Sequence, residues 1–353
     1  MGRLSSIFTV LARSSSSKKS RVVRDHENNG RQAADSIMKN ACKHETVIKS
    51  CGFMNVSGSD NIVSVHSKRG QKGSNQDCVI AWDEFGCQAD MMFCGIFDGH
   101  GDWGHYVSKI ARDTFPPFLL CNWQEALENS PEKSHFDYKL WKNVCVQSCA
   151  AVDRHLKLLR NVDSFNSGTT GLALIRQGDN IVIANVGDSR AVLGTVSGEG
   201  RLMAHQLTTD FKPDLPEEEK RIMQSNGRVF CVRDEPGVHR VWRPDDDSPG
   251  LAMSRAFGDY CVKEYGIISL PEVTHYRITC DDKFIILATD GVWDVVSSEE
   301  AAIIVDGTTD KAKAAKRLVE FAILAWKLKR KQIARDDISA ICIFFRSSYS
   351  AME

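Results

Sequence analysis

Five aspartates stand at the ends of β-rich runs, where they could act together as ligands of a metal ion. Asp98, Asp188 and Asp290 each follow such a run, and Asp77 and Asp336 each precede one. Carboxylates gathered at one edge of a sheet cannot all stay ionised without a cation between them. Oxygen donors with no Cys or His companions select hard ions such as Mg²⁺ or Mn²⁺.

The β-rich runs predict how these aspartates meet. The runs 78–82 and 91–97, joined by the turn-rich segment 83–86, predict a hairpin. Its open end would place Asp77 opposite Asp98, because the start of one antiparallel strand and the end of its partner share an edge. Asp290 and Asp336 would share an edge in the same way if their strands pair. For any single Asp-Gly the ordinary interpretation is a turn, whereas five aspartates at strand ends favour a metal site.

Composition excludes several classes of protein. The chain has 353 residues, of which 42% are hydrophobic and 26% charged, so wholesale disorder is excluded. The net charge of -1 argues against a nucleic-acid partner bound by bulk charge. The longest apolar runs have strand length, which is too short to span a bilayer. Twelve cysteines at irregular spacing, with no C-x-x-C pair, are expected to be reduced core thiols of an intracellular protein.

The first 24 residues differ in composition from the rest of the chain. They contain Arg and Lys but no acidic residue, and they include the serine run 14–17. The start Met1-Gly2, with Ser6, fits the pattern for myristoylation at Gly2. One acyl chain binds a membrane weakly, and a basic patch is the usual second signal. We expect a lipid-anchored tail that phosphorylation of its serines would release. A transit peptide or a plain unacylated tail are the alternatives.

The motifs around the aspartates resemble a known family, the metal-dependent type 2C protein Ser/Thr phosphatases, with plant-like features. The similarity covers about 60–346. A single Asp-Gly-His is weak evidence, but eight blocks in family order are specific. They are KGSNQD at 72–77, FDGHG at 97–101, SGTTG at 167–171, NVGDSRA at 185–191, TDFKP at 209–213, AMSRAFGD at 252–259, ATDGVWD at 288–294 and RDDIS at 335–339.

This resemblance implies an α+β fold, an α-β-β-α sandwich of two antiparallel sheets flanked by helices. Composition predicts a basic, Ser-rich and disordered N-terminal tail over 1–55, and the resemblance implies a catalytic domain over 56–347, followed by a C-terminal tail over 348–353. Periodicity and start signals agree with such a fold. They predict helices over 103–115, 139–160, 215–225, 298–304 and 310–328, with strands dominating between them.

The resemblance also assigns metal-binding roles. It implies that Asp98 bridges two Mn²⁺ or Mg²⁺ ions and that Gly99 contributes its backbone carbonyl. Asp290 and Asp336 would hold the second ion, and Asp77 would orient a metal-bound water. Asp188 together with Asp290 would hold a weaker third ion.

Two further residues match catalytic positions of the family. His100 corresponds to the general acid, and Lys72 stands where the family usually has an arginine that binds the substrate phosphate; Arg69 is a second candidate for that role. A hydroxide bridging the two ions would then attack the phosphorus of a phosphoserine or phosphothreonine, while His100 protonates the leaving oxygen.

Three residues depart from the family pattern. Gln76 replaces an acid, Lys72 offers a point charge instead of a bidentate fork, and Phe211 replaces a His. Gln76 is the one feature that favours an alternative function, a pseudophosphatase that regulates by binding a kinase or receptor. A calcium-stabilised binding module also suits clustered aspartates, but it leaves the Gly-His and Ser-Arg blocks without a role.

Two other segments carry open interpretations. In this family a mobile flap lies near 231–248, so Trp242 either rests on the flap or packs in the core. The basic segment 327–331 resembles a nuclear signal, but on the polar face of a helix it is ordinary solvated charge. The expected partners are phosphorylated proteins, including kinases, and a membrane surface contacted by the tail, but no nucleic acid. The expected location is intracellular, at the cytoplasmic face of a membrane, in the cytosol or in the nucleus.

Overall fold

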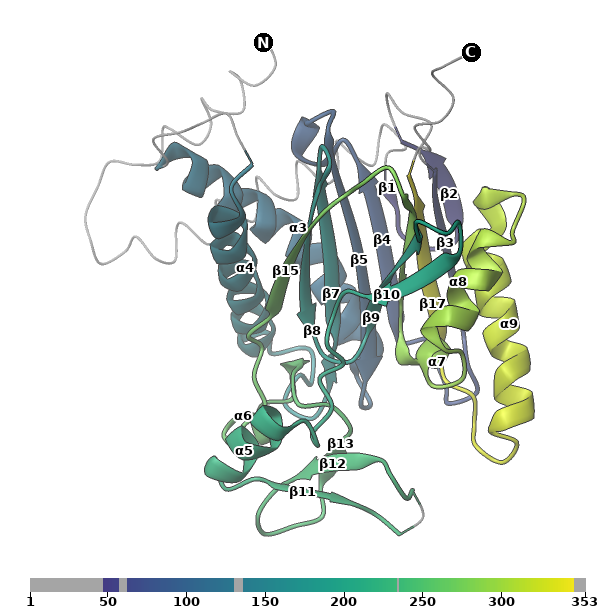
Figure 1. Ribbon diagram of the computed structural model, residues 1–353. Helices are drawn as coiled ribbons and strands as arrows, with labels where there is room; N and C mark the ends of the chain where they lie inside the picture. Colours follow the sequence, from purple (N-terminus) through teal and green to yellow (C-terminus); the bar gives the residue numbers. More distant parts are fainter. Residues whose placement is uncertain (1–46, 57–61, 130–135, 234, 346–353) are drawn as a thin grey trace, which may run out of the picture.

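Two antiparallel sheets form the centre of the computed structural model (Figure 1), which describes residues 47–56, 62–129, 136–233 and 235–345. The first sheet has the order β1 (Val47–Ile48), β4 (Asp77–Asp83), β5 (Met91–His100), β7 (Gly171–Gln177), β8 (Asn180–Val186) and β15 (Glu272–Arg277). In addition, β6 (Gly168–Thr169) pairs with β5, and β14 (Phe257–Gly258) pairs with β6. The second has the order β10 (Leu202–Gln206), β9 (Arg190–Val196), β16 (Asp282–Ala288), β17 (Ile338–Phe344), β3 (Ile62–Lys68) and β2 (Gly52–Asn55).

The central strands of both sheets are buried on both faces, and their alternate side chains point to opposite sides. In β4, Val79 and Ala81 belong to the core between the two sheets. Ile80 and Trp82 belong to the core between the first sheet and its helices. This double burial explains why the central strands appear in the sequence as continuous apolar runs.

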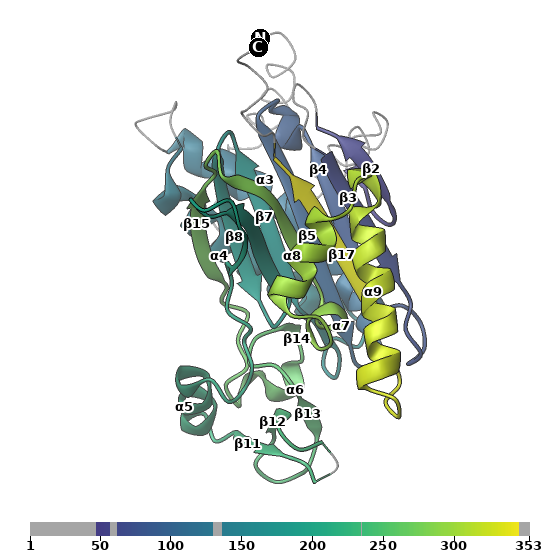
Figure 2. The ribbon, with the colours of Figure 1, turned by 45° about the vertical axis from the view of Figure 1, so that its right-hand side comes forward.

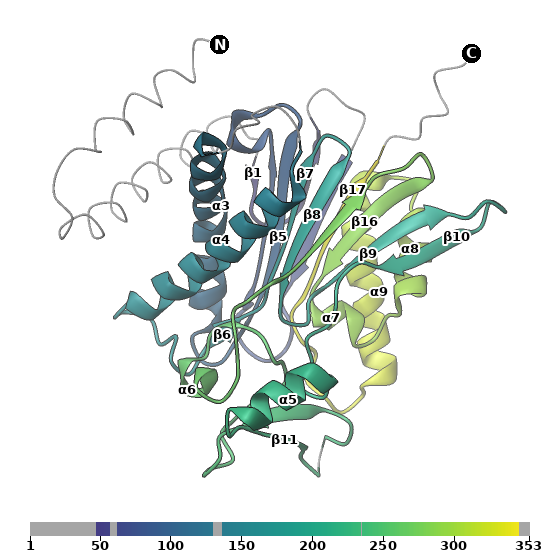
Figure 3. The same cartoon turned by 60° about the vertical axis from the view of Figure 1, so that its left-hand side comes forward.

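Two helical layers complete the sandwich (Figures 2 and 3). The helices α3 (Gly104–Glu128) and α4 (Tyr138–Leu158) cover the outer face of the first sheet. The outer face of the second sheet is covered by α8 (Ser298–Asp306) and α9 (Ala314–Lys329), the latter preceded by the 3-10 turn η2 (Lys311–Lys313). The predicted α-β-β-α architecture is therefore confirmed.

A smaller unit, here called the flap, lies below one end of the sandwich in Figure 2. It contains α5 (Pro216–Gln224), the three-stranded sheet β11 (Arg228–Cys231), β12 (His239–Trp242) and β13 (Pro249–Leu251), and α6 (Tyr260–Lys263). The flap has its own small core around Ile222 and Val241. Trp242 stacks on Phe230 with ring centroids 5.0 Å apart, so it packs within the flap and not in the central core.

Helix predictions from the sequence hold except in length. The helix predicted over 103–115 extends to Glu128 and passes through Pro116 and Pro117. It continues because Leu119 and Trp123 beyond the prolines are buried against the first sheet, and this packing outweighs the local cost of proline. The two four-residue helices, α6 and α7 (Asp290–Trp293), are too short to show periodicity and were not predicted.

The cysteine and membrane predictions can be compared with the described part of the chain. Its cysteines are all free thiols; Cys94 and Cys342 are among the buried ones, whereas Cys51, Cys87 and Cys280 are exposed. Cys94 is therefore a core residue of β5, as predicted, and burial raises the pKa of its thiol. No helix in these ranges is long and apolar enough to cross a membrane. Gly2 lies outside the described residues.

Candidate active site

The open end of the β4–β5 hairpin places two of the predicted ligands opposite each other. Asp77 and Asp98 are direct partners in the antiparallel register. Beyond them the Gly99 amide donates to the Gln76 carbonyl at 3.2 Å. A Cβ at position 99 would lie 2.4 Å from the Gly104 carbonyl oxygen, so only glycine allows the start of α3 to approach here. The predicted hairpin and its juxtaposition of carboxylates are confirmed.

The second sheet brings its aspartates to the same end of the sandwich. Asp290 follows β16 and Asp336 precedes β17, and these strands pair next to each other. Asp188 lies in the turn between β8 and β9, and β9 is the other neighbour of β16. Each predicted carboxylate therefore lies at one end of its strand, as the sequence indicated.

Asp77 joins the two sheets. Its Oδ2 accepts hydrogen bonds from the hydroxyl of Ser339 in β17 at 2.7 Å and from that of Thr289, directly after β16, at 3.1 Å. Its other oxygen, Oδ1, is buried and has no hydrogen-bond partner among the described residues, and the same holds for Oδ1 of Asp188. Two unpartnered carboxylate oxygens at one site are the donors that a hard cation takes up.

The electrostatics of this centre favour a cation. Burial, together with repulsion from neighbouring carboxylates, raises the pKa values of Asp98 and Asp290 well above the ordinary range. Burial and the carboxylates of Asp337 and Asp336 raise the pKa of Asp77 to about 7, against hydrogen bonds from Ser339 and Thr289. Such shifts arise when like charges share a buried site. The residues present therefore fit a Mg²⁺ or Mn²⁺ ion, whose charge would keep them ionised.

Two lysines currently hold part of the carboxylate set. The Lys72 ammonium pairs with Asp336, and the Lys212 ammonium pairs with Asp188. In the described part of the chain, no three Asp, Glu, His or Cys side chains form a ready-made metal cage. Lys212 was missed from the sequence, although it lies in the quoted block at 209–213. Its nearness to Asp188 depends on the fold of that loop, which no local spacing reveals.

His100 pairs with Asp259, an acid that no sequence motif singled out. Its Nε2 lies 2.6 Å from Oδ2 of Asp259, whose side chain is buried. Burial opposes a charged imidazole, but the Asp259 carboxylate outweighs it, so the pKa of His100 is raised. Asp259 lies 159 positions away in the chain, at the end of the quoted block 252–259. The pair leaves Nδ1 of His100 as the nitrogen available for other contacts.

Gln76 has a structural task in the loop that carries His100. Its side-chain amide donates to the Gly101 carbonyl at 2.9 Å, and its backbone amide donates to Asp337 at 2.7 Å. A carboxylate at position 76 could not donate to that carbonyl. Asp337 also accepts from the Gly70 amide at 2.6 Å. Asp337 was not predicted as a site residue, yet it fixes the loop that presents Lys72.

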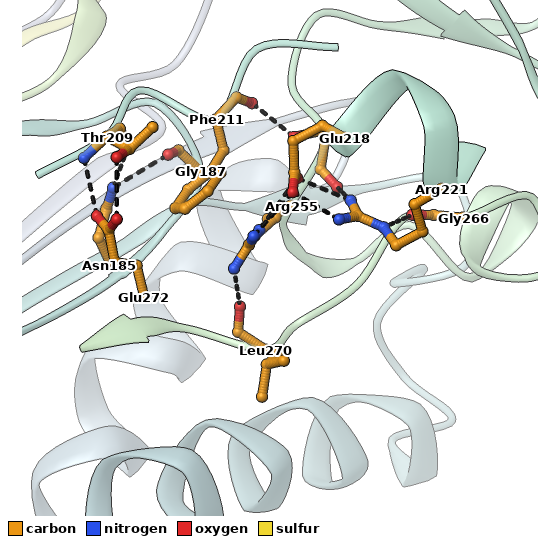
Figure 4. A network of polar contacts seen from close by, with 11 residues as sticks. Asn185, Gly187, Thr209, Phe211, Glu218, Arg221, Arg255, Gly266, Leu270 and Glu272 are labelled. Atoms are coloured by element: carbon orange, nitrogen blue, oxygen red, sulfur yellow. Dashed lines mark hydrogen bonds and ion pairs between the residues drawn. The ribbon is translucent and has the colours of Figure 1, made fainter. Parts of the chain in front are cut away.

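An ion cluster ties the flap to the loop beside the centre (Figure 4). The buried Glu218 of α5 accepts hydrogen bonds from Arg221 at 2.6 Å, Arg255 at 2.8 Å and the Ser254 hydroxyl at 2.5 Å. Burial opposes its charge, but these donors outweigh burial and lower the pKa of Glu218 to about 2. The Arg255 guanidinium lies 3.6 Å from the ring centroid of Phe211.

Phe211 carries this connection to the carboxylates. Its amide donates to the Gly187 carbonyl at 3.1 Å, and its own carbonyl accepts from the Ser254 amide at 2.8 Å. Gly187 directly precedes Asp188 in the chain. Lys212, which follows Phe211, forms an ion pair with Asp188. In this way the position that departs from the family pattern links the flap to the turn that carries Asp188.

Comparisons with known proteins show the family. The family model described as "Protein phosphatase 2C" matches residues 61–326, which leaves Asp336 outside the matched range. The chain is 58% identical to "Probable protein phosphatase 2C 34" of Arabidopsis thaliana over 99% of both chains. It is 53% identical to "Probable protein phosphatase 2C 48" of Oryza sativa subsp. japonica, covering 98% of this chain and 99% of the relative.

Solved structures share the fold. The serine-threonine phosphatase 2C from Toxoplasma gondii aligns with a TM-score of 0.74 and 25% identity, covering 85% of this chain and 99% of that one. A C. elegans sex determining protein aligns with a TM-score of 0.62 and 22% identity, covering 80% of this chain and 64% of that one, which shows the fold alone. With the family model, the full-length relatives and the fold in agreement, the chain belongs to the protein phosphatase 2C family, as a plant-like protein phosphatase.

Proposed function

We propose that the protein hydrolyses phosphoserine and phosphothreonine in proteins in a reaction that depends on Mn²⁺ or Mg²⁺. The observation that carries this proposal is the meeting of carboxylates from both sheets at one end of the sandwich, with two buried oxygens left without hydrogen-bond partners in the described ranges. Metal dependence is general to the family. Asp98, Asp290, Asp336 and the Gly99 carbonyl would hold two ions, Asp77 would orient a water, and Asp188 would contribute to a weaker third site.

When bound, the ions would supply Lewis acidity and an activated water nucleophile. The chain's own residues act around that chemistry. Lys72, exposed beside Asp336, binds a phosphoryl oxygen of the substrate as a point charge. His100, held by Asp259, gives its proton to the departing serine or threonine oxygen, a role typically worth about 10²–10⁴-fold in rate.

A phosphopeptide assay tests the proposal. We expect hydrolysis of phosphoserine and phosphothreonine peptides in Mn²⁺ or Mg²⁺ and loss of activity in excess EDTA. Full activity in EDTA would contradict it.

Gln76 is the observation that favours a pseudophosphatase as the second candidate function, one that binds a kinase or receptor without turnover. Its amide bonds to Gly101, which gives Gln76 a role in the loop and weakens that case. Complete inactivity with metal bound would favour the second candidate.

We also propose that Gly2 is acylated and that the basic tail brings the protein to the cytoplasmic face of a membrane. The support is the Met-Gly start with Ser6, followed by six basic residues before Asp25. A Gly2→Ala fusion should move to the cytosol or nucleus with unchanged phosphatase activity. If the Gly2→Ala fusion distributes in the cell like the wild type, the proposal of a lipid anchor at Gly2 is wrong.

A further inference from the structure

A basic surface borders the carboxylate centre on two loops, one between β3 and β4 and one between α9 and β17. The loop after α9 begins at the lower end of that helix in Figure 1, and the flap lies on the other side. The side chains of this surface, called here the basic rim, are Arg69, Lys72, Arg330, Lys331 and Arg335. Lys72 is its innermost member, because it pairs with Asp336.

Backbone contacts hold the two loops together. The Gln71 amide donates to the Arg335 carbonyl at 2.8 Å, and the Arg335 amide donates to the Gln71 side chain at 3.0 Å. The Arg335 guanidinium donates to the Arg69 carbonyl at 3.1 Å. A Cβ at Gly70 would lie 2.4 Å from the Arg335 carbonyl oxygen, so the loops touch where only glycine fits. The basic side chains therefore project from one fixed backbone platform.

The charge of the rim is only partly balanced by acids of this chain: the charge of Arg330 acts on the Asp294 carboxylate, and Asp336 and Asp337 follow Arg335 directly. The segments 61–76 and 321–335 contain no Asp or Glu. In the described ranges, Arg69, Arg330, Lys331 and Arg335 form no ion pair with a carboxylate, and the buried Nε of Arg335 has no hydrogen-bond partner. The pairing of Lys72 with Asp336 is the exception, and Asp336 is a proposed metal ligand. The rim therefore presents cations without ion-pair partners among the described residues beside the place where a phosphate would be hydrolysed.

We propose that the basic rim binds acidic side chains that flank the phosphorylated residue, so that the preferred substrates are phosphoproteins with Asp or Glu near the phosphosite. This inference rests on the proposed function. Complementary charge increases encounter rates and selects partners at exposed surfaces. On the flap, by contrast, Arg228, Arg240 and Arg243 are already paired with flap carboxylates. An acidic flank is therefore directed to the unpaired cations of the rim.

Paired phosphopeptides test the rim. The two peptides share one sequence, except that three Asp residues on each side of the phosphoserine become Asn in the second. We expect the wild type in Mn²⁺ to show a kcat/KM roughly tenfold higher for the acidic peptide, since exposed ion pairs each contribute up to about fivefold. Arg69→Gln/Lys331→Gln should reduce this ratio to about two- to threefold. Raising NaCl to 0.5 M should also reduce the ratio in the wild type, because salt screens exposed charges.

A charge-matched variant on the other helical layer is the control. Lys139→Gln/Lys142→Gln removes two exposed lysines from α4, and the ratio should stay at the wild-type value. Equal kcat/KM for both peptides in the wild type would overturn the proposal. The proposal would also be overturned if the rim variant and the α4 control variant changed the ratio equally. If neither peptide is hydrolysed, the proposed function fails. The rim is then judged by fluorescence anisotropy, where equal affinity for both peptides overturns it.

An anionic membrane is the other surface that such a rim could contact. Sedimentation with vesicles of phosphatidylserine and phosphatidylcholine distinguishes it. We expect Arg69→Gln/Lys331→Gln to bind these vesicles as the wild type does while losing its peptide preference. Loss of vesicle binding with an unchanged peptide ratio would overturn the proposal.

Discussion

At the scale of single residues, the orientation of the His100 ring depends on a partner distant in the chain. A histidine between two glycines after a metal ligand is already a candidate acid, but its sequence does not say what orients the ring. Asp259 does so through Nε2 at 2.6 Å, and it is positioned by a left-handed backbone with φ of +53° before α6. The site depends on this buried carboxylate as much as on the motif that contains His100.

The leaving group separates acid catalysis from metal positioning. His100→Ala should lower kcat for phosphopeptides by about 10²–10⁴-fold, because a serine alkoxide needs a proton to depart. Hydrolysis of p-nitrophenyl phosphate should fall less than about tenfold, because nitrophenolate leaves without one. Asp259→Asn should show the same substrate dependence to a smaller extent. Equal losses on both substrates would assign His100 to the metal site instead.

Asp98 should contribute to activity at the expense of stability. Asp98→Asn should lower turnover at least about 100-fold, since it removes a carboxylate that would hold the ions. It should also raise Tm in EDTA at pH 7.5 by about 2–4 °C, because burial and neighbouring carboxylates oppose the ionised form of Asp98. Kinetics and differential scanning calorimetry measure the two effects. A variant that keeps most of the wild-type activity would show that Asp98 is not a ligand.

At the scale of elements, the sequence predicts the strands and the meeting of their aspartates because burial and turn chemistry are local signals. It does not predict that α3 continues through Pro116, because the packing of Leu119 and Trp123 comes from distant strands. The sequence does not predict the pairs Lys212–Asp188 and Asp259–His100 either, because each joins segments that are distant in the chain. The roles of the predicted ligands themselves stay predictions.

Glu218 should control how firmly the flap is held. Glu218→Gln leaves Arg221 and Arg255 without their shared carboxylate, so we expect a loss of about 2–3 kcal/mol of unfolding free energy. The pKa of Glu218 is lowered on folding to about 2 from 4.5, so its stabilisation is complete above pH 4.5. That stabilisation should disappear as the pH falls toward 2.

Urea unfolding of the wild type and Glu218→Gln at a series of pH values measures this difference. Glu217→Gln, exposed on the same helix, is the matched control and should change stability by less than about 0.5 kcal/mol. A difference between wild type and Glu218→Gln that does not shrink below pH 4.5 would show that the carboxylate charge is not what holds the flap.

At the scale of the whole molecule, the two sheets are joined at a point where like charges accumulate. Asp77 bridges the sheets, and its neighbours Asp98 and Asp290 are opposed by burial and by one another. Repulsion between these buried carboxylates therefore destabilises the folded protein at the same end of the sandwich where we propose that cations bind. Folding and the proposed metal binding would then be coupled through these carboxylates.

This coupling gives the metal-free protein a definite pH dependence. The pKa of Asp77 is raised on folding from 3.8 to about 7, and those of Asp98 and Asp290 are raised as well. Between the unfolded and folded values the folded state binds more protons, so its stability falls as the pH rises. In EDTA, Tm should decrease steadily from pH 5 to pH 7.5.

A divalent cation that binds only the folded state adds about 2.7 kcal/mol to the free energy of unfolding when its concentration is 100 times its Kd.

The gain in Tm from 1 mM Mn²⁺ should therefore grow between pH 5 and pH 7.5, because the ion binds ionised carboxylates and removes the repulsion that deprotonation creates. Differential scanning calorimetry with and without Mn²⁺ measures this gain at each pH. Asp98→Asn removes one of the titrating ligands and should flatten both the decline in EDTA and the gain in Mn²⁺. A gain that is the same at every pH would mean that the cation binds away from these carboxylates, and the candidate site would then be wrong.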